Sequence, residues 1–369
     1  MQKIGIIGIG KLGLCLALNL EKAGFDVIGI DLSQEYVDLI NTKKLSSPEP
    51  YVSEMLLQSK NLKASIHLSD ILSKDVKIIF VLVPTTANNT DGYDHHYLDG
   101  VMNSLVCFGI REEEVLLVIS STTMPGYCDS LAKRLEPHNY HIIYNPEFIA
   151  QGRVIYDQTN MAQVIFGSDN PEKAKILERI YDKLNVNAAP KYYYMSRKSA
   201  ELTKIATNCF LTTKIAFANS IGDLATSIGA DPDLVLDAIG ADPRIGSEFL
   251  KYGFGYGGPC LPRDNRALSQ IEKEGLPEDL LLSEAVDHSN KAHLEYQLKQ
   301  FQKKYNTSEI IIFDQVTYKK GTPNTEESQQ LALAINLAKQ GYRVKIVETQ
   351  NLINTISERF GDLFEYEIR

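Results

Sequence analysis

The sequence has few cysteines and no long apolar run, and these absences exclude several classes of protein. No stretch approaches the roughly 20 apolar residues that a membrane-spanning helix needs. The N-terminal MQKIGIIGIG enters an expected strand directly, without the pattern of a signal peptide. The cysteines are odd in number and scattered, which indicates free thiols in a reducing compartment: Cys15, Cys107, Cys128, Cys209 and Cys260. We therefore expect a cytoplasmic protein without a membrane partner.

Clusters of positive charge and of metal ligands are also missing. A net charge of −9 argues against a general nucleic-acid binder, and no stretch interleaves basic with aromatic residues. This charge is compatible with a local basic pocket for a phosphorylated small molecule. His95 and His96 are adjacent, and His138 and His141 lie at a strand edge without a clustered carboxylate partner. We therefore expect neither a nucleic-acid partner nor a metal site.

Residues 3–31 carry the pattern of a dinucleotide-binding turn. An apolar strand, a glycine-rich turn, a helical segment and a second strand follow one another and end at Asp31. Gly8 is expected to make the tight turn, Gly10 to let the backbone approach a pyrophosphate, and Gly13 to allow close packing of helix on strand. Asp31 can accept hydrogen bonds from ribose hydroxyls and would repel a 2′-phosphate, which favours NAD over NADP. The turn and helix start are the expected phosphate-binding residues: Gly8, Gly10, Lys11, Leu12 and Gly13.

Further strand-like runs at 76–83, 115–120 and 140–145 alternate with helical segments. This alternation predicts an α/β fold with an N-terminal Rossmann-type, doubly wound parallel sheet, whose ligands bind beyond the carboxyl ends of the strands. Two hydroxyl-bearing loops lie at such ends: Val83-Pro84-Thr85 and Ser121-Thr122-Thr123. Ordinary capping of the loops by these hydroxyls is the alternative to a role in cofactor binding.

A second glycine-rich stretch, GFGYGGPCLPRD at 253–264, surrounds one cysteine. Its glycines at 255, 257 and 258 allow the backbone to approach a ligand closely. Pro262 suits the first position of a helix, which we expect over 262–273. A thiol directly before a helix N-terminus is favoured as a thiolate, so Cys260 is a candidate nucleophile. The alternative is a buried and inert thiol in a glycine-rich loop.

This stretch resembles the GxGYGGxCxPKD segment of the UDP-glucose/GDP-mannose dehydrogenase family, with Arg263 in place of the usual lysine. The resemblance covers nearly the whole chain and is densest at 3–31, 145–148, 197–219 and 244–264. It implies an NAD-dependent enzyme that oxidises the C6 alcohol of a nucleotide sugar to a carboxylate, with UDP-glucose as the foremost substrate. Cys260 would form a thiohemiacetal, whose oxidation gives a thioester that water hydrolyses.

The resemblance also implies roles for three loops. Val83-Pro84-Thr85 and Ser121-Thr122 match cofactor-facing loops of the family, although the segment 121–127 departs from the usual STVPxGT. Asn145-Pro146-Glu147-Phe148 matches the family's NPEF, in which the glutamate helps to activate the hydrolytic water. The family's second glutamate is Gln151 here. Glu147 is therefore the single expected base, working with Thr122 on one water.

One long helix is expected over 197–229, with an apolar surface that we expect to be buried: Leu202, Ile205, Cys209, Phe210, Ile215, Phe217 and Ile221. Lys204 and Asn208 project from one face of this helix, one turn apart. A solvated face that Lys204 shares with Glu201 is the blander interpretation. The family's AExxKxxxN pattern favours Lys204 and Asn208 as stabilisers of oxyanions, with Asp264 ordering water or Lys204. It also implies a homodimer formed through this helix.

The resemblance suggests where the substrate binds and how the domains are divided. The implied substrate contacts are Glu147, Phe148, Lys204, Asn208, Arg244, Phe254, Gly255, Gly257 and Lys319. Arg244 often reaches the site of the neighbouring subunit in this family. We expect an NAD-binding domain (1–195), a central helical and dimerisation domain (196–304) and a shortened nucleotide-sugar-binding α/β domain (305–369), with strands at 308–314 and 342–348 around a helix at 325–340.

The shortened C-terminal domain departs most from the family. A family segment KxNTDDxRES aligns with 319–328, and this alignment places Glu326 at the position of a nucleotide-binding arginine. Either the nucleotide is held differently, through Lys319 or Lys320, or the alignment is shifted by some residues. The first interpretation is favoured and predicts weak affinity for UDP-glucose.

Three other functions stay open at this point. A two-electron dehydrogenase of the β-hydroxyacid type would share the Rossmann domain and the helical lysine but would have no use for Cys260. A non-catalytic paralogue would bind nucleotide without turnover. Another nucleotide sugar, such as a UDP-N-acetylhexosamine or GDP-mannose, would leave the chemistry unchanged. The number of NADH molecules formed per substrate separates the first of these from four-electron oxidation.

Overall fold

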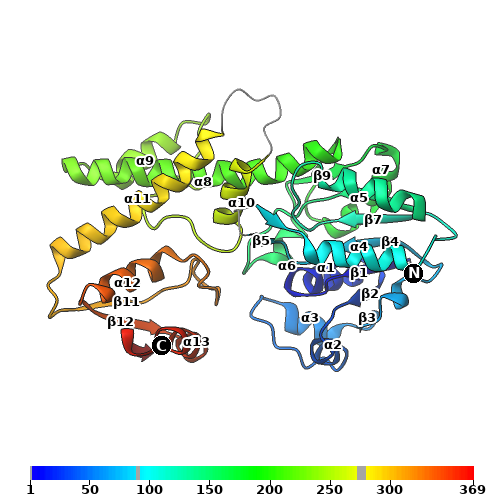
Figure 1. The fold of residues 1–369 in the computed structure, drawn as a ribbon, viewed down its shortest axis with the longest axis horizontal. Coiled ribbons are helices and arrows are strands. Elements are labelled where there is room, and N and C mark those ends of the chain that lie inside the picture. The colour runs from blue at the N-terminus through cyan, green and yellow to red at the C-terminus, as the bar shows by residue number, and fades with distance from the viewer. Residues whose placement is uncertain (1, 89–91, 272–279) are drawn as a thin grey trace. The chain divides into compact units, whose positions relative to one another are not determined.

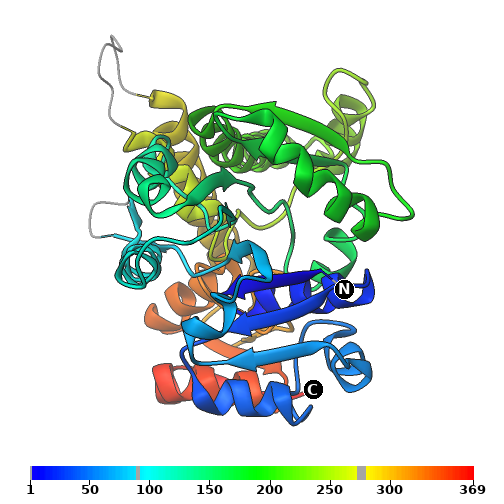
Figure 2. The ribbon, with the colours of Figure 1, turned by 90° about the vertical axis from the view of Figure 1, so that its right-hand side faces the viewer.

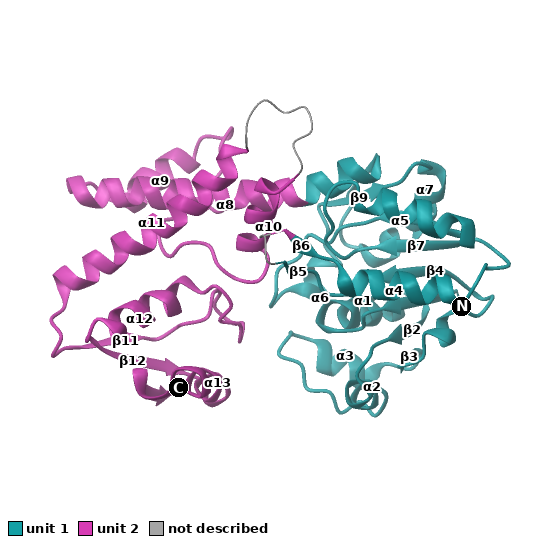
Figure 3. Cartoon of the chain, viewed as in Figure 1, with its two compact units in different colours: residues 1–89, 93–204 teal, residues 90–92, 205–369 magenta. Residues whose placement is uncertain are grey.

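The computed structural model describes residues 2–88, 92–271 and 280–369 (Figure 1). Its contacts divide the chain into two compact units (Figure 3). Unit 1 comprises 1–89 and 93–204, and unit 2 comprises 90–92 and 205–369. Unit 2 therefore contains most of the expected central domain together with the C-terminal one. The division into three domains stays a prediction.

Unit 1 is built on an eight-stranded sheet with helices on both faces (Figures 1 and 2). Its strands, in the order of the sheet, are β10 (Lys191–Met195), β9 (Gln163–Gly167), β8 (Tyr140–Tyr144), β7 (Val115–Ile119), β4 (Val76–Val81), β1 (Lys3–Ile7), β2 (Asp26–Ile30) and β3 (Leu62–Ser65). Neighbours pair in parallel except β8 and β9, which meet antiparallel at Tyr144 and Gly167. The central strands are nearly continuous apolar runs, as parallel strands buried on both faces require.

The helices of unit 1 cover the two faces of this sheet. They are α1 (Lys11–Lys22), α2 (Gln34–Asn41), α3 (Val52–Gln58), α4 (His96–Cys107), α5 (Tyr127–Leu135), α6 (Val154–Asp157) and α7 (Pro171–Leu184). Apolar residues of α1, α3 and α7 form one core, and those of α4 and α5 form the other. A small hairpin, β5 (Thr86–Ala87) and β6 (Tyr93–Asp94), follows β4. The predicted doubly wound sheet is confirmed, whereas β3, β9 and β10 had not been predicted.

The long helix α8 (Arg197–Ile228) begins in unit 1 and continues into the helical part of unit 2, and its predicted bounds agree with the structure. It is followed by α9 (Pro232–Gly240), α10 (Leu261–Ser269) and α11 (Leu281–Lys304). The expected helix over 262–273 begins one residue earlier, at Leu261, so Pro262 occupies its second position. It ends at Ser269, with Gln270 as its C-cap, so the predicted continuation over 270–271 is wrong, while 272–273 lie outside the described residues. No helix in the described part of the chain combines the length and apolar character that crossing a membrane requires.

The C-terminal part of unit 2 is a three-stranded parallel sheet in the order β11 (Ile310–Phe313), β12 (Arg343–Glu348) and β13 (Glu365–Ile368). Two helices connect the strands: α12 (Gln329–Lys339) and α13 (Gln350–Phe360). Right-handed crossovers between sequential parallel strands place both helices on one face of the sheet. Ile311 and Phe313 of β11 are accordingly buried against that face, whereas Ile310 and Ile312 are exposed. The predicted strands are confirmed, but α12 begins later than the predicted 325.

Candidate active site

The glycine turn between β1 and α1 has the geometry of a phosphate-binding turn. Gly8 has a φ of 86°, and a Cβ there would lie 2.6 Å from the carbonyl oxygen of Leu82. A Cβ on Gly13 would lie 2.0 Å from the carbonyl oxygen of Gly8, which explains why helix and strand pack so closely. A Cβ on Gly10 would meet nothing within 4 Å. Gly10 is also the N-cap of α1, so the first N–H groups of this helix are available to an anion.

Asp31 follows β2 directly and lies beside this turn. The backbone N–H of Gly8 donates to the carbonyl of Ile30 at 2.9 Å, which joins the turn to the end of β2. The Asp31 carboxylate is half-buried and accepts from the backbone N–H of Ser33 at 3.1 Å. Ser33 in turn caps α2. The turn, the helix start and the oriented carboxylate together fit a dinucleotide with free ribose hydroxyls.

The two predicted cofactor loops are bonded to each other. The Ser121 hydroxyl donates to the carbonyl of Val83 at 2.8 Å, and the Thr85 hydroxyl donates to the carbonyl of Thr122 at 2.8 Å. Pro84 lies between the two bonded residues of its loop. The hydroxyls of Ser121 and Thr85 therefore do hold the loops, as the capping alternative proposed, while Thr122 takes part through its carbonyl. The two interpretations are compatible, since a fixed loop presents a fixed surface to a cofactor.

Glu147 is the buried carboxyl of the NPEF loop. Asn145 anchors this loop by donating to the carbonyl of Ile165 at 2.9 Å and by accepting from the Tyr181 hydroxyl. Neither oxygen of Glu147 has a hydrogen-bond partner among the described residues. Burial raises the pKa of Glu147 to about 7, against the opposing influence of Lys204 and of the Gln158 amide. This carboxyl can therefore exchange its proton near neutral pH.

Lys204 lies against the same loop. Its ammonium donates to the backbone carbonyl of Glu147 at 2.7 Å and lies 4.9 Å from the centre of the Phe148 ring. The structure thus brings together three of the predicted site residues of unit 1. Glu201, one turn earlier on α8, is fully buried. The interpretation of Glu201 as part of a solvated face with Lys204 is therefore wrong, because its carboxylate is bound inside unit 1.

In unit 2, Cys260 is the N-cap residue of α10, directly before the helix as the sequence predicts. It is exposed, which contradicts the alternative of a buried thiol. One turn later, the carboxylate of Asp264 is fully buried. One of its oxygens accepts from the Asn208 amide at 2.6 Å, and the other accepts two bonds from the Arg263 guanidinium at 2.9 and 2.7 Å. Asp264 thus fixes the orientation of the Asn208 amide, and the Arg263 guanidinium compensates the buried negative charge of Asp264.

Polar side chains of two helices hold the loop that precedes Cys260. Asn290 of α11 donates to the carbonyl of Tyr256 and accepts from its N–H, both at 3.0 Å. Asn219 of α8 accepts from the N–H of Gly253 at 3.0 Å. His293 of α11 contacts the carbonyl of Gly253 at 2.7 Å. These clamps fix the backbone of the loop independently of any ligand.

The glycines of this loop are needed for packing within the protein. A Cβ on Gly255 would lie 2.2 Å from the side-chain oxygen of Asn290, and one on Gly257 would lie 2.3 Å from the carbonyl oxygen of Glu327. The predicted reason for Gly255 and Gly257 was close approach to a ligand. The protein itself occupies the side where their side chains would lie. Phe254, between the clamped residues, stays partly exposed.

The segment aligned with the family's arginine lies against the cysteine loop. The backbone carbonyl of Glu326 accepts from the N–H of Gly258 at 2.9 Å, whereas the Glu326 side chain is exposed. Lys319 is half-buried, and its carbonyl accepts from the Thr322 hydroxyl at 2.8 Å. Arg244 lies elsewhere, on an exposed loop, where it pairs with Asp242 at 2.6 Å. In the single chain Arg244 is therefore a surface residue.

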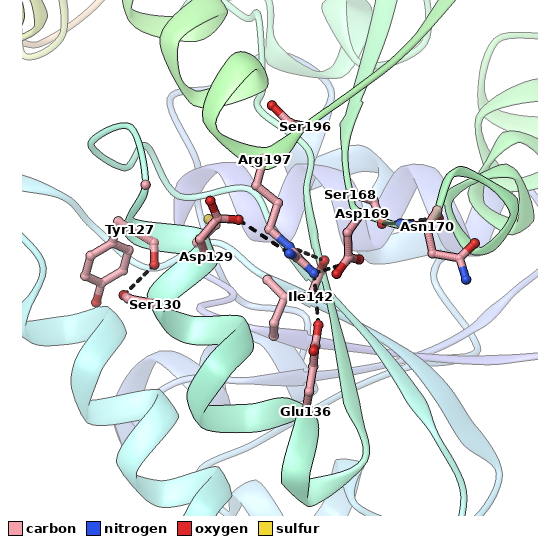
Figure 4. A network of polar contacts seen from close by, with 12 residues as sticks. Tyr127, Asp129, Ser130, Glu136, Ile142, Ser168, Asp169, Asn170, Ser196 and Arg197 are labelled. Atoms are coloured by element: carbon pink, nitrogen blue, oxygen red, sulfur yellow. Dashed lines mark hydrogen bonds and ion pairs between the residues drawn. The ribbon is translucent and has the colours of Figure 1, made fainter.

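An additional polar network of unit 1 had not been predicted. The buried Arg197 guanidinium donates to the carbonyl of Ile142 and to the carboxylates of Asp129, Glu136 and Asp169 (Figure 4). His141 lies with Glu136 and Asp169, so the expectation that this histidine lacks clustered carboxylates is wrong. The carboxylate oxygens of Glu136 and Asp169 already bind the Arg197 guanidinium. Burial lowers the pKa of His141. The network therefore anchors the first turn of α8.

Two family models match the chain consecutively. One is described as the NAD binding domain of the UDP-glucose/GDP-mannose dehydrogenase family and matches residues 2–185; the other is that family's central domain and matches residues 198–292. The chain belongs to this family. NAD is its cofactor, as the glycine turn and Asp31 indicated, and its substrates are nucleotide sugars.

Individual relatives differ in the sugar that their names give. The chain is 29% identical to a putative UDP-glucose 6-dehydrogenase of Bacillus subtilis over 362 residues, which are 95% of this chain and 82% of that protein. It is also 29% identical to the GDP-mannose 6-dehydrogenase of Pseudomonas aeruginosa over 367 residues, which are 94% and 81% of the two chains. An uncharacterized protein of Methanocaldococcus jannaschii is 33% identical over 266 residues, but the match spans 71% of this chain and only 30% of that protein.

Solved structures confirm the fold. A UDP-glucose dehydrogenase from Pyrobaculum islandicum superimposes with a TM-score of 0.88 at 24% identity and covers all of this chain and 86% of its own. The α/β architecture with a large Rossmann-type sheet and a helical central region is therefore the established fold of this chain.

Proposed function

We propose that this protein oxidises UDP-glucose to UDP-glucuronate in two NAD-dependent steps through a covalent intermediate on Cys260. The observation that carries the proposal is the position of this thiol. It is exposed at the N-terminus of α10, on a loop fixed by two helices, one turn before the buried Asp264, which binds the half-buried Asn208 of α8. A two-electron dehydrogenase would have no use for such a thiol.

The proposed reaction balances as an alcohol, two NAD⁺ and one water giving a carboxylate, two NADH and three protons. NAD, when bound, supplies the hydride-accepting chemistry. The C6 alcohol first loses a hydride and a proton to become an aldehyde. The Cys260 thiolate adds to the aldehyde carbon and forms a thiohemiacetal, which loses the second hydride and a proton to become a thioester. Water then attacks the thioester carbonyl, and the thiolate leaves.

The chain's own residues have distinct tasks in this scheme. The Lys204 ammonium and the Asn208 amide stabilise the negative oxygen of the tetrahedral species. Asp264 orients Asn208 through their 2.6 Å hydrogen bond. Glu147 takes a proton from the attacking water, a task suited to a carboxyl with a pKa of about 7. Gln151 occupies the place of the family's second glutamate, so Glu147 acts without a second carboxylate, with Thr122 as its partner on the water.

The choice of sugar is the least constrained part of the proposal. Relatives of equal identity are named for UDP-glucose and for GDP-mannose. We prefer UDP-glucose because the sequence as a whole resembles the UDP-glucose 6-dehydrogenases of the family, and the Bacillus subtilis relative is named for that sugar. We assign the sugar and nucleotide contacts to Phe148, Phe254, Arg244 and Lys319, with weak affinity because Glu326 replaces an arginine. A homodimer in the cytoplasm completes the proposal, since a reducing compartment keeps a catalytic thiol reduced.

The test is the stoichiometry of NADH formation with a panel of UDP- and GDP-sugars. Wild-type protein should form two NADH per sugar consumed and release no free aldehyde. Cys260→Ala should form no acid but should still bind NADH. Cys107→Ala, a change at another exposed cysteine, is the matched control and should leave turnover unchanged. One NADH per substrate would replace the proposal with a two-electron dehydrogenase, and no turnover of any sugar would favour a non-catalytic paralogue.

A further inference from the structure

The first turns of α8 present three charged side chains on one face. Arg197, Glu201 and Lys204 are spaced by four and three residues, so they follow one another along the same side of the helix. Each contacts a different part of unit 1. Arg197 binds the carbonyl of Ile142 in β8, and Lys204 binds the carbonyl of Glu147 in the NPEF loop. Glu201, between them, binds the segment that follows β7.

The Glu201 carboxylate replaces the missing cap of α5. The N-cap of α5 is Gly126, with a φ of 95° and no side chain to accept a hydrogen bond. Glu201 accepts instead from the N–H of Gly126 at 2.6 Å and from the N–H of Cys128 at 2.8 Å. A carboxylate at a helix N-terminus satisfies otherwise unpaired N–H groups and interacts favourably with the helix dipole. It thereby compensates part of the cost of burying this charge.

The same carboxylate reaches the cofactor loop. One Glu201 oxygen accepts from the Thr123 hydroxyl at 2.9 Å. Thr123 follows Thr122, whose carbonyl is bonded to Thr85 in the other cofactor loop. One turn along α8, Lys204 is bonded to the NPEF loop. Glu201 therefore connects the loops at the carboxyl ends of β4 and β7 to the helix that carries the lysine.

We infer that Glu201 is a positioning residue, which sets the cofactor loop 121–126 in register with Lys204. This inference rests on the proposed function, because Lys204 is assigned its role there. Loss of the carboxylate frees the N-terminus of α5 and the Thr123 hydroxyl, so the loop shifts relative to the glycine turn. The expected consequence is weaker binding of NAD together with slower turnover, with the protein still folded.

Glu201→Gln keeps the size of the side chain but leaves one accepting oxygen for three donors. It should weaken NADH binding by about tenfold, which corresponds to about 1.4 kcal/mol, and should raise the KM for NAD. Glu201→Asp should restore part of the affinity, and Thr123→Val, which removes a single donor, should have a smaller effect. Binding is read from NADH fluorescence, which is simple here because the protein has no tryptophan.

The control is Glu21→Gln. Glu21 also accepts from two backbone N–H groups of unit 1, those of Lys60 and Asn61, but these lie before β3. This variant should lose comparable thermal stability and bind NADH within twofold of wild type. If Glu201→Gln binds NADH as wild type does, or if both glutamine variants weaken binding equally, the positioning role is refuted.

A double-mutant cycle tests the connection to the lysine. If Glu201 acts on turnover by placing Lys204, the effect of Glu201→Gln on kcat should shrink in a Lys204→Ala background. Full additivity would overturn this connection. NADH binding does not depend on the identity of the sugar or on Cys260. Failure of the stoichiometry test would therefore remove the proposed reaction while leaving the effect of Glu201 on the cofactor loop to be judged by itself.

Discussion

The raised pKa of Glu147 results from the burial of its carboxyl group without a hydrogen-bond partner among the described residues. The Lys204 ammonium is bonded to the backbone carbonyl of Glu147, while both carboxyl oxygens lie in a buried environment. The nearby thiol of Cys15 experiences the same environment, since burial and the charges of Glu49 and Glu147 raise its pKa to about 12. A low local dielectric penalises every anion in this region. Glu147 is thereby kept protonated up to nearly neutral pH.

Because burial raises the pKa of Glu147, the stability of the protein depends on pH through this residue. Its pKa is about 7 in the folded chain, against an ordinary value of 4.5. Between these values the folded state holds a proton that the unfolded state has lost, so the free energy of unfolding falls as the pH rises through this window. Glu147→Gln removes the titration. The variant should therefore gain stability relative to wild type between pH 5 and pH 8, by about 1–3 kcal/mol.

Urea unfolding of both proteins at several pH values measures this difference. The same variant should lose turnover at all pH values, because the neutral amide cannot accept the proton of the attacking water. A stability difference that is constant from pH 5 to pH 8 would contradict the assignment of this pKa.

The resemblance to the family led us to select Glu147, Lys204, Asn208 and Cys260, whose roles remain proposals. It failed for Glu201. A glutamate three residues before a lysine looks like an ordinary surface pair on a helix. Its burial depends on α5 and on the loop before it, more than 70 residues earlier in the chain. The sequence around Glu201 contains no signal for such a contact. The sequence around Gly126 does contain one, because a helix that starts without a capping side chain needs a hydrogen-bond acceptor from elsewhere.

At the scale of elements, the glycines of the cysteine loop are required for a different physical reason from the one that the sequence suggested. The glycines were expected to make room for a ligand. In the structure they make room for Asn290 and for the segment from Tyr318 to Glu327. The sequence could not show this, because the packing partners come from α11 and from the C-terminal domain. The loop geometry thus depends on the part of the chain that departs most from the family.

Gly258 is the position where this dependence should be measurable. It has a φ of 86°, and a Cβ there would lie 2.6 Å from the ring of Tyr318. Gly258→Ala combines backbone strain with a steric clash and should lower the free energy of unfolding by about 1–3 kcal/mol. The variant should lose NADH formation because Cys260 is displaced, while unit 1 still binds NADH.

Gly253→Ala is the matched control, since a Cβ at Gly253 would meet nothing within 4 Å. It should cost little stability and keep most of the activity. The two variants are compared by urea unfolding and by the rate of NADH formation with the best sugar of the panel. Equal behaviour of the two alanine variants would show that the contact with Tyr318 does not hold the loop.

At the scale of the whole molecule, the alternation of strands and helices predicted the Rossmann-type sheet and the C-terminal α/β unit correctly. The edge strands β3 and β10, the strand β9 beside β10, and the last strand β13 were missed. The three tyrosines in the run KYYYM of β10 are all only half-buried, so this strand lacks the apolar continuity of the central strands. The sequence also predicted that Leu202, Phe210 and Phe217 would be buried on α8. In the single chain this is wrong, because they are 46%, 65% and 48% exposed.

The exposed phenylalanines are best explained by the proposed homodimer. Phe210, Phe217 and Leu224 are seven residues apart, so they form an apolar row along one side of α8, and Leu224 is 55% exposed as well. Rows of this kind are rare on the surface of a monomer and mark association sites. A second copy of α8 offers the same row, which suits a symmetric interface in which each residue meets its equivalent or a near neighbour.

The paired change Phe210→Asp and Phe217→Asp should therefore convert a dimer into a monomer, as read from the mass by light scattering after size-exclusion chromatography. Leu57→Asp is the control, since Leu57 is 62% exposed on α3 of unit 1 and should leave the dimer intact. NADH binding should survive in the monomer, because the cofactor residues all belong to unit 1. The KM for the sugar should rise if Arg244 completes the site of the other subunit, as the resemblance implies. A monomeric wild-type protein would refute the interface, and a monomeric variant with an unchanged KM would show that each chain binds its substrate without the partner's Arg244.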